Sequence, residues 1–265
     1  ALRWVLDHAE QHHITAVNLS FGGGNVAKGD GPASLDGLYR RLADRGITVA
    51  AAAGNNFHAF DSTEGLSVLA ASEHVAAVGS VWDADVGPVA WVNGAKDHAT
   101  DADRVTSFSQ RDAGLELLAP GAQILNLSLA GGLTVRSGTS MATPLVAGSA
   151  ALLREAAGRR DAPLSAADLI RHLRHTARIV IDGDDERDNV INTDRSYRRL
   201  DLADALAEVP ASTAIAADDE PAGDERGGAT ASATPATLRP LRRGARISAF
   251  LLRGESLTGM PSPRP

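Results

Sequence analysis

One helix that must lie inside the protein constrains this chain more than any other feature. Residues 145–153 read Leu-Val-Ala-Gly-Ser-Ala-Ala-Leu-Leu, which is apolar on every side, as expected of a helix surrounded by a core. Small polar residues precede it, so the helix should begin near Ser140 and carry Pro144 in its first turn, where a missing amide hydrogen costs nothing. The rest of the chain is expected to pack around this helix.

The other segments alternate between short apolar runs and amphipathic helices. The run at 47–53 has no polar alternation, which is typical of a strand covered on both faces. The alternation of strands and helices along the chain predicts an α/β fold with a largely parallel sheet. A long polar connection precedes the last predicted strand. The expected strands are 14–19, 47–53, 75–81 and 115–121, and the expected helices besides the buried one are 1–12, 34–46, 165–177 and 200–209.

Ser140 stands at the start of the buried helix, and its hydroxyl has two interpretations. The structural one is that it caps the first turn. The chemical one is that it is a nucleophile, because unpaired amides and the positive end of the helix dipole suit an atom that attacks a carbonyl and generates an oxyanion. The tripeptide Gly-Thr-Ser alone does not decide between them, since short motifs match by chance.

A longer string around Ser140 favours the nucleophile. Residues 138–144, Gly-Thr-Ser-Met-Ala-Thr-Pro, followed by Val-Ala-Gly at 146–148, resemble the nucleophile motif of the subtilisin-like serine peptidases. One position departs, because the family usually has a histidine where this chain has Leu145, but that histidine is not one of the catalytic groups. The resemblance implies a serine endopeptidase that hydrolyses polypeptides through an acyl-enzyme on Ser140.

The resemblance continues upstream of this motif. Thr-Ser-Phe-Ser at 106–109 and Ala-Pro-Gly at 119–121 are similar to family segments that stand in the same order before the serine. Residues 1–209 are covered, which implies a three-layer α/β subtilisin-like fold. This domain would be the carboxyl-terminal two-thirds of the catalytic domain, with the amino-terminal strands missing. Residues 210–265 are rich in Ala, Pro, Thr, Ser and Gly and are expected to be a low-complexity linker or disordered tail.

Asn55 follows the alanine-rich strand at its carboxyl end, where ligands bind in open α/β sheets. The resemblance implies that its side-chain amide donates to the developing oxyanion together with the backbone N–H of Ser140, with Thr139 in support. The alternative is that Asn55-Asn56 forms a turn, because asparagine tolerates left-handed backbone. The match to the serine motif favours the oxyanion role.

Substrate binding is implied at two glycine-containing segments. Ser20, Phe21 and Gly22 resemble the family segment that pairs as an extra strand with the substrate backbone, a mode in which main-chain hydrogen bonds give affinity. Gly54 is expected to leave room for a substrate side chain. The glycine-rich turn after Phe21 lacks both a P-loop Lys-Ser/Thr and a GxGxxG spacing, so a nucleotide site is not predicted.

The base that a serine nucleophile needs is not apparent in this sequence. The family supplies an Asp and a His upstream of the serine, in the motifs Asp-Ser/Thr-Gly and His-Gly-Thr-His, and neither motif occurs here. The eight histidines lie on polar helical faces or in loops. We therefore expect a fragment of a longer parent, which would carry both groups and an amino-terminal prosegment. The alternative is a non-catalytic peptide-binding relic of a protease.

Composition limits the partners. A net charge of −7 without a basic stripe argues against nucleic acid, and the absence of cysteine excludes disulfides and thiolate chemistry. No apolar run is long enough to span a membrane and no signal peptide is predicted, although the resemblance implies an extracellular protein. The acidic stretch 182–189 suggests calcium, but it lacks the EF-hand glycine and closing glutamate, so a solvated loop is favoured. No metal site and no required cofactor are predicted.

Overall fold

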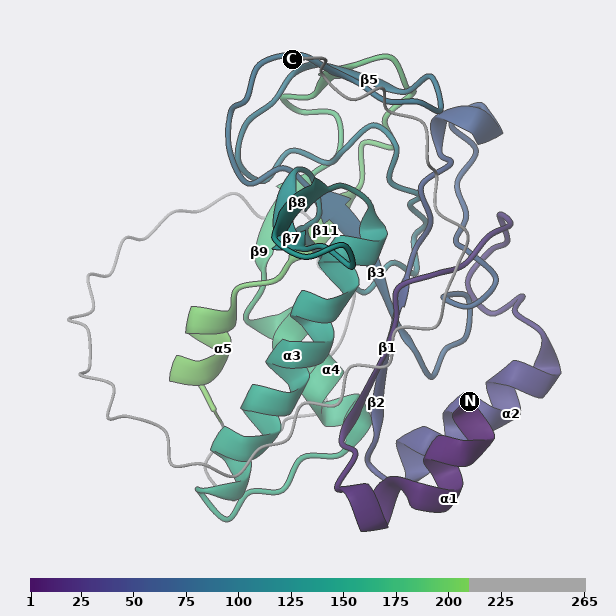
Figure 1. Ribbon diagram of the computed structural model, residues 1–265, viewed down its shortest axis with the longest axis vertical. Coiled ribbons are helices and arrows are strands. Elements are labelled where there is room, and N and C mark those ends of the chain that lie inside the picture. Colours follow the sequence, from purple (N-terminus) through teal and green to yellow (C-terminus); the bar gives the residue numbers. More distant parts are fainter. Residues whose placement is uncertain (210–265) are drawn as a thin grey trace.

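A six-stranded sheet forms the centre of the structure, a computed structural model that describes residues 1–209 (Figure 1). The predicted tail, 210–265, lies outside the described residues. All neighbouring strands of the sheet are parallel except the last pair, which confirms the largely parallel prediction. In spatial order the strands are β1 (Ala16–Leu19), β2 (Thr48–Ala52), β3 (Ala76–Val81), β6 (Leu117–Pro120), β11 (Ser196–Arg199) and β9 (Arg178–Ile181).

Helices cover both faces of this sheet and complete three layers (Figure 1). One core lies under α1 and α2 and contains Tyr39 and Leu42, and the other lies under α3, α4 and α5 and contains Val146 and Leu153. The three-layer α/β prediction is therefore confirmed. The helices are α1 (Leu2–His12), α2 (Ala33–Asp44), α3 (Thr139–Gly158), α4 (Ala166–His175) and α5 (Leu202–Ala207).

Helix α3 begins near Ser140, as predicted, but the predicted position of Pro144 is wrong. The helix already starts at Thr139, so the proline lies beyond the first turn. Proline has no amide hydrogen for the carbonyl four residues earlier, which here is that of Ser140. This carbonyl instead accepts a hydrogen bond of 2.7 Å from the Ser20 hydroxyl, so a tertiary contact replaces the missing helical one.

Seven short strands lie outside the predicted elements, β9 and β11 of the central sheet among them, and two stretches expected to be loops or connections contain some of the others. The polar connection before β6 and the acidic stretch 182–189 both contribute to a second sheet, and Asp182 in that stretch is fully buried. Strands this short carry no readable periodicity, which is why sequence reasoning missed them. The second sheet contains β10 (Arg187–Asp188), β5 (Lys96–Ala99) and β4 (Val89–Ala90), and β7 (Ile124–Leu127) pairs with β8 (Leu133–Arg136) as a hairpin.

Asp182 is buried because it pairs with Arg111, whose side chain is also fully buried. The other Asp182 oxygen accepts from the backbone amide and the hydroxyl of Thr193, both at 2.7 Å. The Arg111 guanidinium also donates to two backbone carbonyls and lies 4.2 Å from the centre of the Phe57 ring. This ion pair connects the loop after β9 to the segment that follows the Thr-Ser-Phe-Ser motif.

We expect Asp182→Ala to lower the free energy of unfolding by about 3–5 kcal/mol, because it leaves the Arg111 charge buried without its partner. Urea unfolding of the 265-residue chain measures the loss. Glu64→Ala is the matched control, since Glu64 pairs with Arg195 at 3.0 Å where both side chains are well exposed. Such pairs contribute no more than about 1 kcal/mol, so equal losses from the two variants would contradict the assignment.

A second prediction concerns Asp188 in β10. Burial, with Asp97 and Asp182 nearby, raises the pKa of Asp188 from its ordinary 3.8 to about 6. The folded protein therefore binds this proton more tightly than the unfolded chain, and stability present below pH 3.8 should be lost as the pH rises through 6. Asp188→Asn mimics the protonated group, so its stability advantage over the natural chain should grow across that window. If the unfolding free energies of the natural chain and of Asp188→Asn changed in parallel with pH, the raised pKa of Asp188 would be contradicted.

Candidate active site

The residues expected to form the site lie at one edge of the central sheet. Strands β1 and β2 are parallel neighbours, so the segments that follow them, Ser20–Gly22 and Gly54–Asn55, emerge from the same side. Ligands bind at this carboxyl edge in open α/β sheets. The start of α3 joins the same edge, since the Ser20 hydroxyl bonds to the first turn of that helix.

Thr139 holds the Asn55 side chain in a defined orientation. The backbone amide of Thr139 donates to Asn55 Oδ1 at 2.8 Å, and its hydroxyl donates to the same oxygen at 3.0 Å. The hydroxyl itself accepts from the Gly54 amide at 3.2 Å. A backbone N–H only donates, so the atom facing it is the amide oxygen and the Nδ2 group points the other way. Within residues 1–209, neither hydrogen of that Nδ2 group has a partner.

Ser140 is half-buried in the first turn of α3, directly after Thr139. In the described part of the chain, neither its backbone amide nor its hydroxyl donates a hydrogen bond. Gly138 precedes the turn with a φ of +145°, and an added Cβ there would lie only 3.2 Å from Asn55 Nδ2. The structure therefore brings together a serine hydroxyl, an unpaired amide and a free carboxamide donor at a helix N-terminus, which are the groups that acyl transfer needs.

The residues assigned to substrate binding lie beside this site, and two of their side chains already make contacts within the fold. The Ser20 hydroxyl bonds to the Ser140 carbonyl and, at 3.1 Å, to Asn18 Oδ1, so it connects β1 to α3. The Phe21 side chain packs against the core under α1 and α2. Gly22 is exposed, and an added Cβ would approach a side-chain oxygen to 2.6 Å. Only backbone groups of this segment are left to pair with a substrate.

The direction that a Cβ of Gly54 would take is already filled, and the expectation that Gly54 leaves room for a substrate side chain stays a prediction. A Cβ at Gly54 would lie 1.9 Å from Gln110 Oε1, so the Gln110 side chain already fills that volume. Gln110 is fully buried and donates to the Gly24 carbonyl at 3.0 Å and to Asn25 Oδ1 at 2.8 Å. Sequence reasoning missed this residue, although it directly follows the Thr-Ser-Phe-Ser motif.

Asn93 is a second residue that sequence reasoning missed. It lies in the turn between β4 and β5, and its Nδ2 donates to the backbone carbonyl of Asn55 at 2.7 Å. Asn55 is therefore held at its side chain by Thr139 and at its backbone by Asn93. No local signal marks Asn93, because the turn reaches Asn55 only through the second sheet.

No histidine in residues 1–209 donates to or accepts from Ser140. The ring nitrogens of His8 and His172 bond to backbone carbonyls, and His74 lies 4.0 Å from an aspartate on α2. The expectation that the general base and its orienting carboxylate come from chain upstream stays a prediction.

Three carboxylates of the acidic stretch, on Asp184, Asp185 and Glu186, place oxygens within 4.8 Å of one another. Arg104 already pairs with Asp185 at 3.1 Å, and both Glu186 oxygens accept backbone amides. These contacts compete with a cation for the same lone pairs. Calcium binding here stays a prediction.

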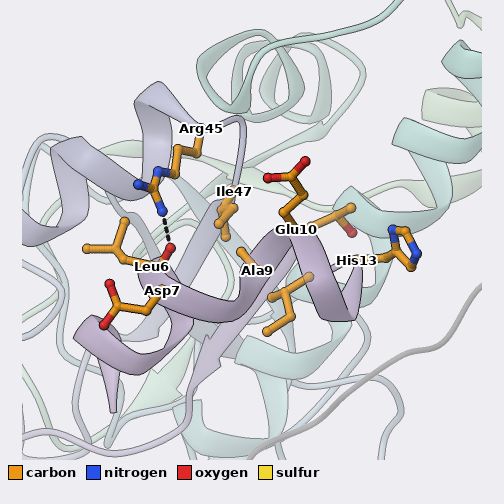
Figure 2. A pocket seen from close by; sticks show the side chains of 9 residues that line it. Leu6, Asp7, Ala9, Glu10, His13, Arg45 and Ile47 are labelled. Atoms are coloured by element: carbon orange, nitrogen blue, oxygen red, sulfur yellow. Dashed lines mark hydrogen bonds between the residues drawn. The ribbon is translucent and has the colours of Figure 1, made fainter.

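A surface pocket lies on the opposite edge of the sheet, between α1 and the loop before β2 (Figure 2). Arg45 crosses it to bond to the Leu6 carbonyl. Ile14 and Ile47, which precede β1 and β2, line this pocket, whereas Asn55 follows the far end of β2. The pocket is therefore separate from the candidate site. Among helices in residues 1–209, none has the length and apolar character needed to cross a bilayer.

A mostly parallel α/β sheet that presents a helix N-terminal serine beside an oriented asparagine amide is typical of a serine hydrolase that works by acyl transfer. The model of the subtilase family matches residues 2–205, so the chain belongs to this family of serine peptidases. The resemblance seen in the sequence is thereby confirmed.

Curated relatives agree with this assignment. Subtilisin-like protease 1 of Arthroderma gypseum is 32% identical over 156 residues, which are 57% of this chain and 26% of that protein. Subtilisin-like serine protease AsES of Sarocladium strictum is 34% identical over 52% of this chain and 29% of its own length. Subtilisin of Bacillus pumilus is 32% identical over 57% of this chain and 47% of its own length. The chain thus spans between about a quarter and half of these relatives.

Solved structures share the fold. The patellamide maturation protease PatA superimposes with a TM-score of 0.58 and 25% identity, over 78% of this chain and 67% of that one. The prenylagaramide maturation protease PagA gives the same TM-score at 24% identity, over 79% of this chain and 67% of that one.

Proposed function

We propose that the protein is a serine endopeptidase whose nucleophile is Ser140 and whose oxyanion donors are the Asn55 side chain and the Ser140 amide. The observation that supports this is the pair of hydrogen bonds from Thr139 to Asn55 Oδ1, because they leave the amide hydrogens free beside the serine. A turn-forming asparagine does not need this orientation. The proposal includes polypeptide substrates, an extracellular location and no required cofactor.

In the proposed reaction the Ser140 oxygen attacks the carbonyl carbon of a peptide bond while a base takes its proton. The carbonyl oxygen becomes negative and accepts from Asn55 Nδ2 and the Ser140 amide. The tetrahedral species collapses to an ester on Ser140 as the amine leaves with a proton from the same base, and water then hydrolyses the ester. The base and its carboxylate, a His and an Asp, are proposed to come from chain outside residues 1–265.

Expression of the 265-residue chain tests where the base lies. Alone, it should not hydrolyse casein or a chromogenic peptide at a useful rate, because loss of the histidine from subtilisin costs about a million-fold in turnover. The longer gene product with an upstream Asp and His should be active. Hydrolysis by the short chain that disappears in Ser140→Ala would show that the base is internal, and an inactive longer product would favour the peptide-binding relic.

A further inference from the structure

Helix α1 carries two histidines four residues apart on one side. His8 is half-buried and His12 is exposed, while Val5, Leu6 and Ala9 form the buried side. Residues at this spacing lie above one another on a helix. The chain has eight histidines, and only these two are separated by four positions.

The two imidazole rings already lie close and nearly parallel. Their centroids are 6.2 Å apart with 26° between the ring planes, and the Trp4 ring stacks on His8 at 4.4 Å. Two imidazoles on one ion, with metal–nitrogen bonds of about 2.1 Å, have centroids roughly 5 Å apart. The Trp4 ring also stacks on His12, at 5.5 Å, so the exposed His12 side chain has to rotate off that ring to close the difference.

A hydrogen bond sets the tautomer of His8. Its Nδ1 lies 2.9 Å from the carbonyl oxygen of Trp4. A carbonyl only accepts, so Nδ1 carries the hydrogen and the neutral ring presents a lone pair at Nε2. Metal-binding histidines characteristically donate their second ring N–H to a carbonyl or carboxylate in this way, which orients the ring and raises its basicity.

We propose that His8 and His12 form a binding site for a late first-row divalent transition metal, with Cu²⁺ bound more tightly than Ni²⁺ or Zn²⁺. Imidazole nitrogen suits these ions, and copper stands highest in the affinity order. Calcium and magnesium require oxygen ligands, whereas the two acidic residues of α1, Asp7 and Glu10, line the pocket between α1 and the loop before β2 (Figure 2). Water completes the coordination.

Titration of the 265-residue chain with Cu²⁺ tests the site, with equilibrium dialysis for stoichiometry and partial quenching of tryptophan fluorescence as the signal from Trp4, one of three tryptophans. Bound Cu²⁺ should quench Trp4, which stacks on His8. We expect one ion per chain, and at least tenfold weaker binding in either His8→Ala or His12→Ala, since even an outer-shell partner is worth about 10–100-fold. Circular dichroism confirms that α1 stays folded in both variants.

A control variant with altered spacing distinguishes binding by the His8–His12 pair from binding that depends only on the number of histidines. The double variant Asp7→His with His12→Gln keeps two imidazoles in α1 but places them at adjacent positions, which do not face each other on a helix, so it should bind as weakly as His8→Ala. His175→Ala removes an exposed histidine from α4 and should bind Cu²⁺ like the natural chain. Unchanged affinity in the spacing control, or in a chain lacking both His8 and His12, would overturn the proposal.

Discussion

Ser140→Ala is expected to abolish peptide hydrolysis by the proposed longer protein, with a loss of about a million-fold in kcat. That magnitude is the one measured in subtilisin, whose family this chain shares, when the serine is removed. The hydroxyl is the only group of the site placed to form the ester, whereas Asn55 and the Ser140 amide remain in the variant. KM should therefore change little while turnover falls.

Labelling by a serine-directed phosphonate and steady-state kinetics on a chromogenic peptide measure this effect. Ser137→Ala is the matched control, because Ser137 lies in the same segment but its hydroxyl only accepts from the Gln123 amide at 2.8 Å. That variant should keep both labelling and turnover. Undiminished labelling of Ser140→Ala would remove Ser140 from the site.

Asn55→Ala should reduce kcat about 100- to 1,000-fold in the same protein, or roughly 2.7–4 kcal/mol of transition-state stabilisation, with substrate affinity retained. This is the range of kcat loss found when one oxyanion donor is removed from a subtilisin. The expected loss follows from the geometry, because Thr139 holds Oδ1 and leaves Nδ2 to meet an oxyanion that exists only after attack.

Loss of the Thr139 contacts in Asn55→Ala is a competing explanation, and Asn55→Asp separates the two. The aspartate keeps an oxygen for the Thr139 amide and hydroxyl but offers no N–H, so it should be at least as inactive as the alanine variant. Asn56→Ala, which changes the neighbouring half-buried asparagine, should retain activity. Near-normal turnover in Asn55→Asp would remove Asn55 from the oxyanion site.

Much of the fold was readable because its signals are local. The all-buried β2 and the apolar α3 are continuous hydrophobic segments, and the capping box that opens α4 lies within four residues, from Ser165 to Asp168. Ser140 and Asn55 were found for a related reason, since each follows a recognisable element and belongs to a motif with fixed spacing. The short strands of the second sheet carry no such signal, and they were missed.

The sequence by itself determined the family, the three layers and the identity of the candidate nucleophile and oxyanion donor. Only the tertiary structure decided how these groups are held. The Ser20 hydroxyl donates to the Ser140 carbonyl, which Pro144 leaves without a helical partner, and the Gln110 side chain occupies the direction of a Cβ at Gly54. The physical reason is distance along the chain. The Ser20–Ser140 bond joins residues 120 positions apart, and a hydrogen bond or ion pair over such a separation leaves no periodicity or motif in either segment.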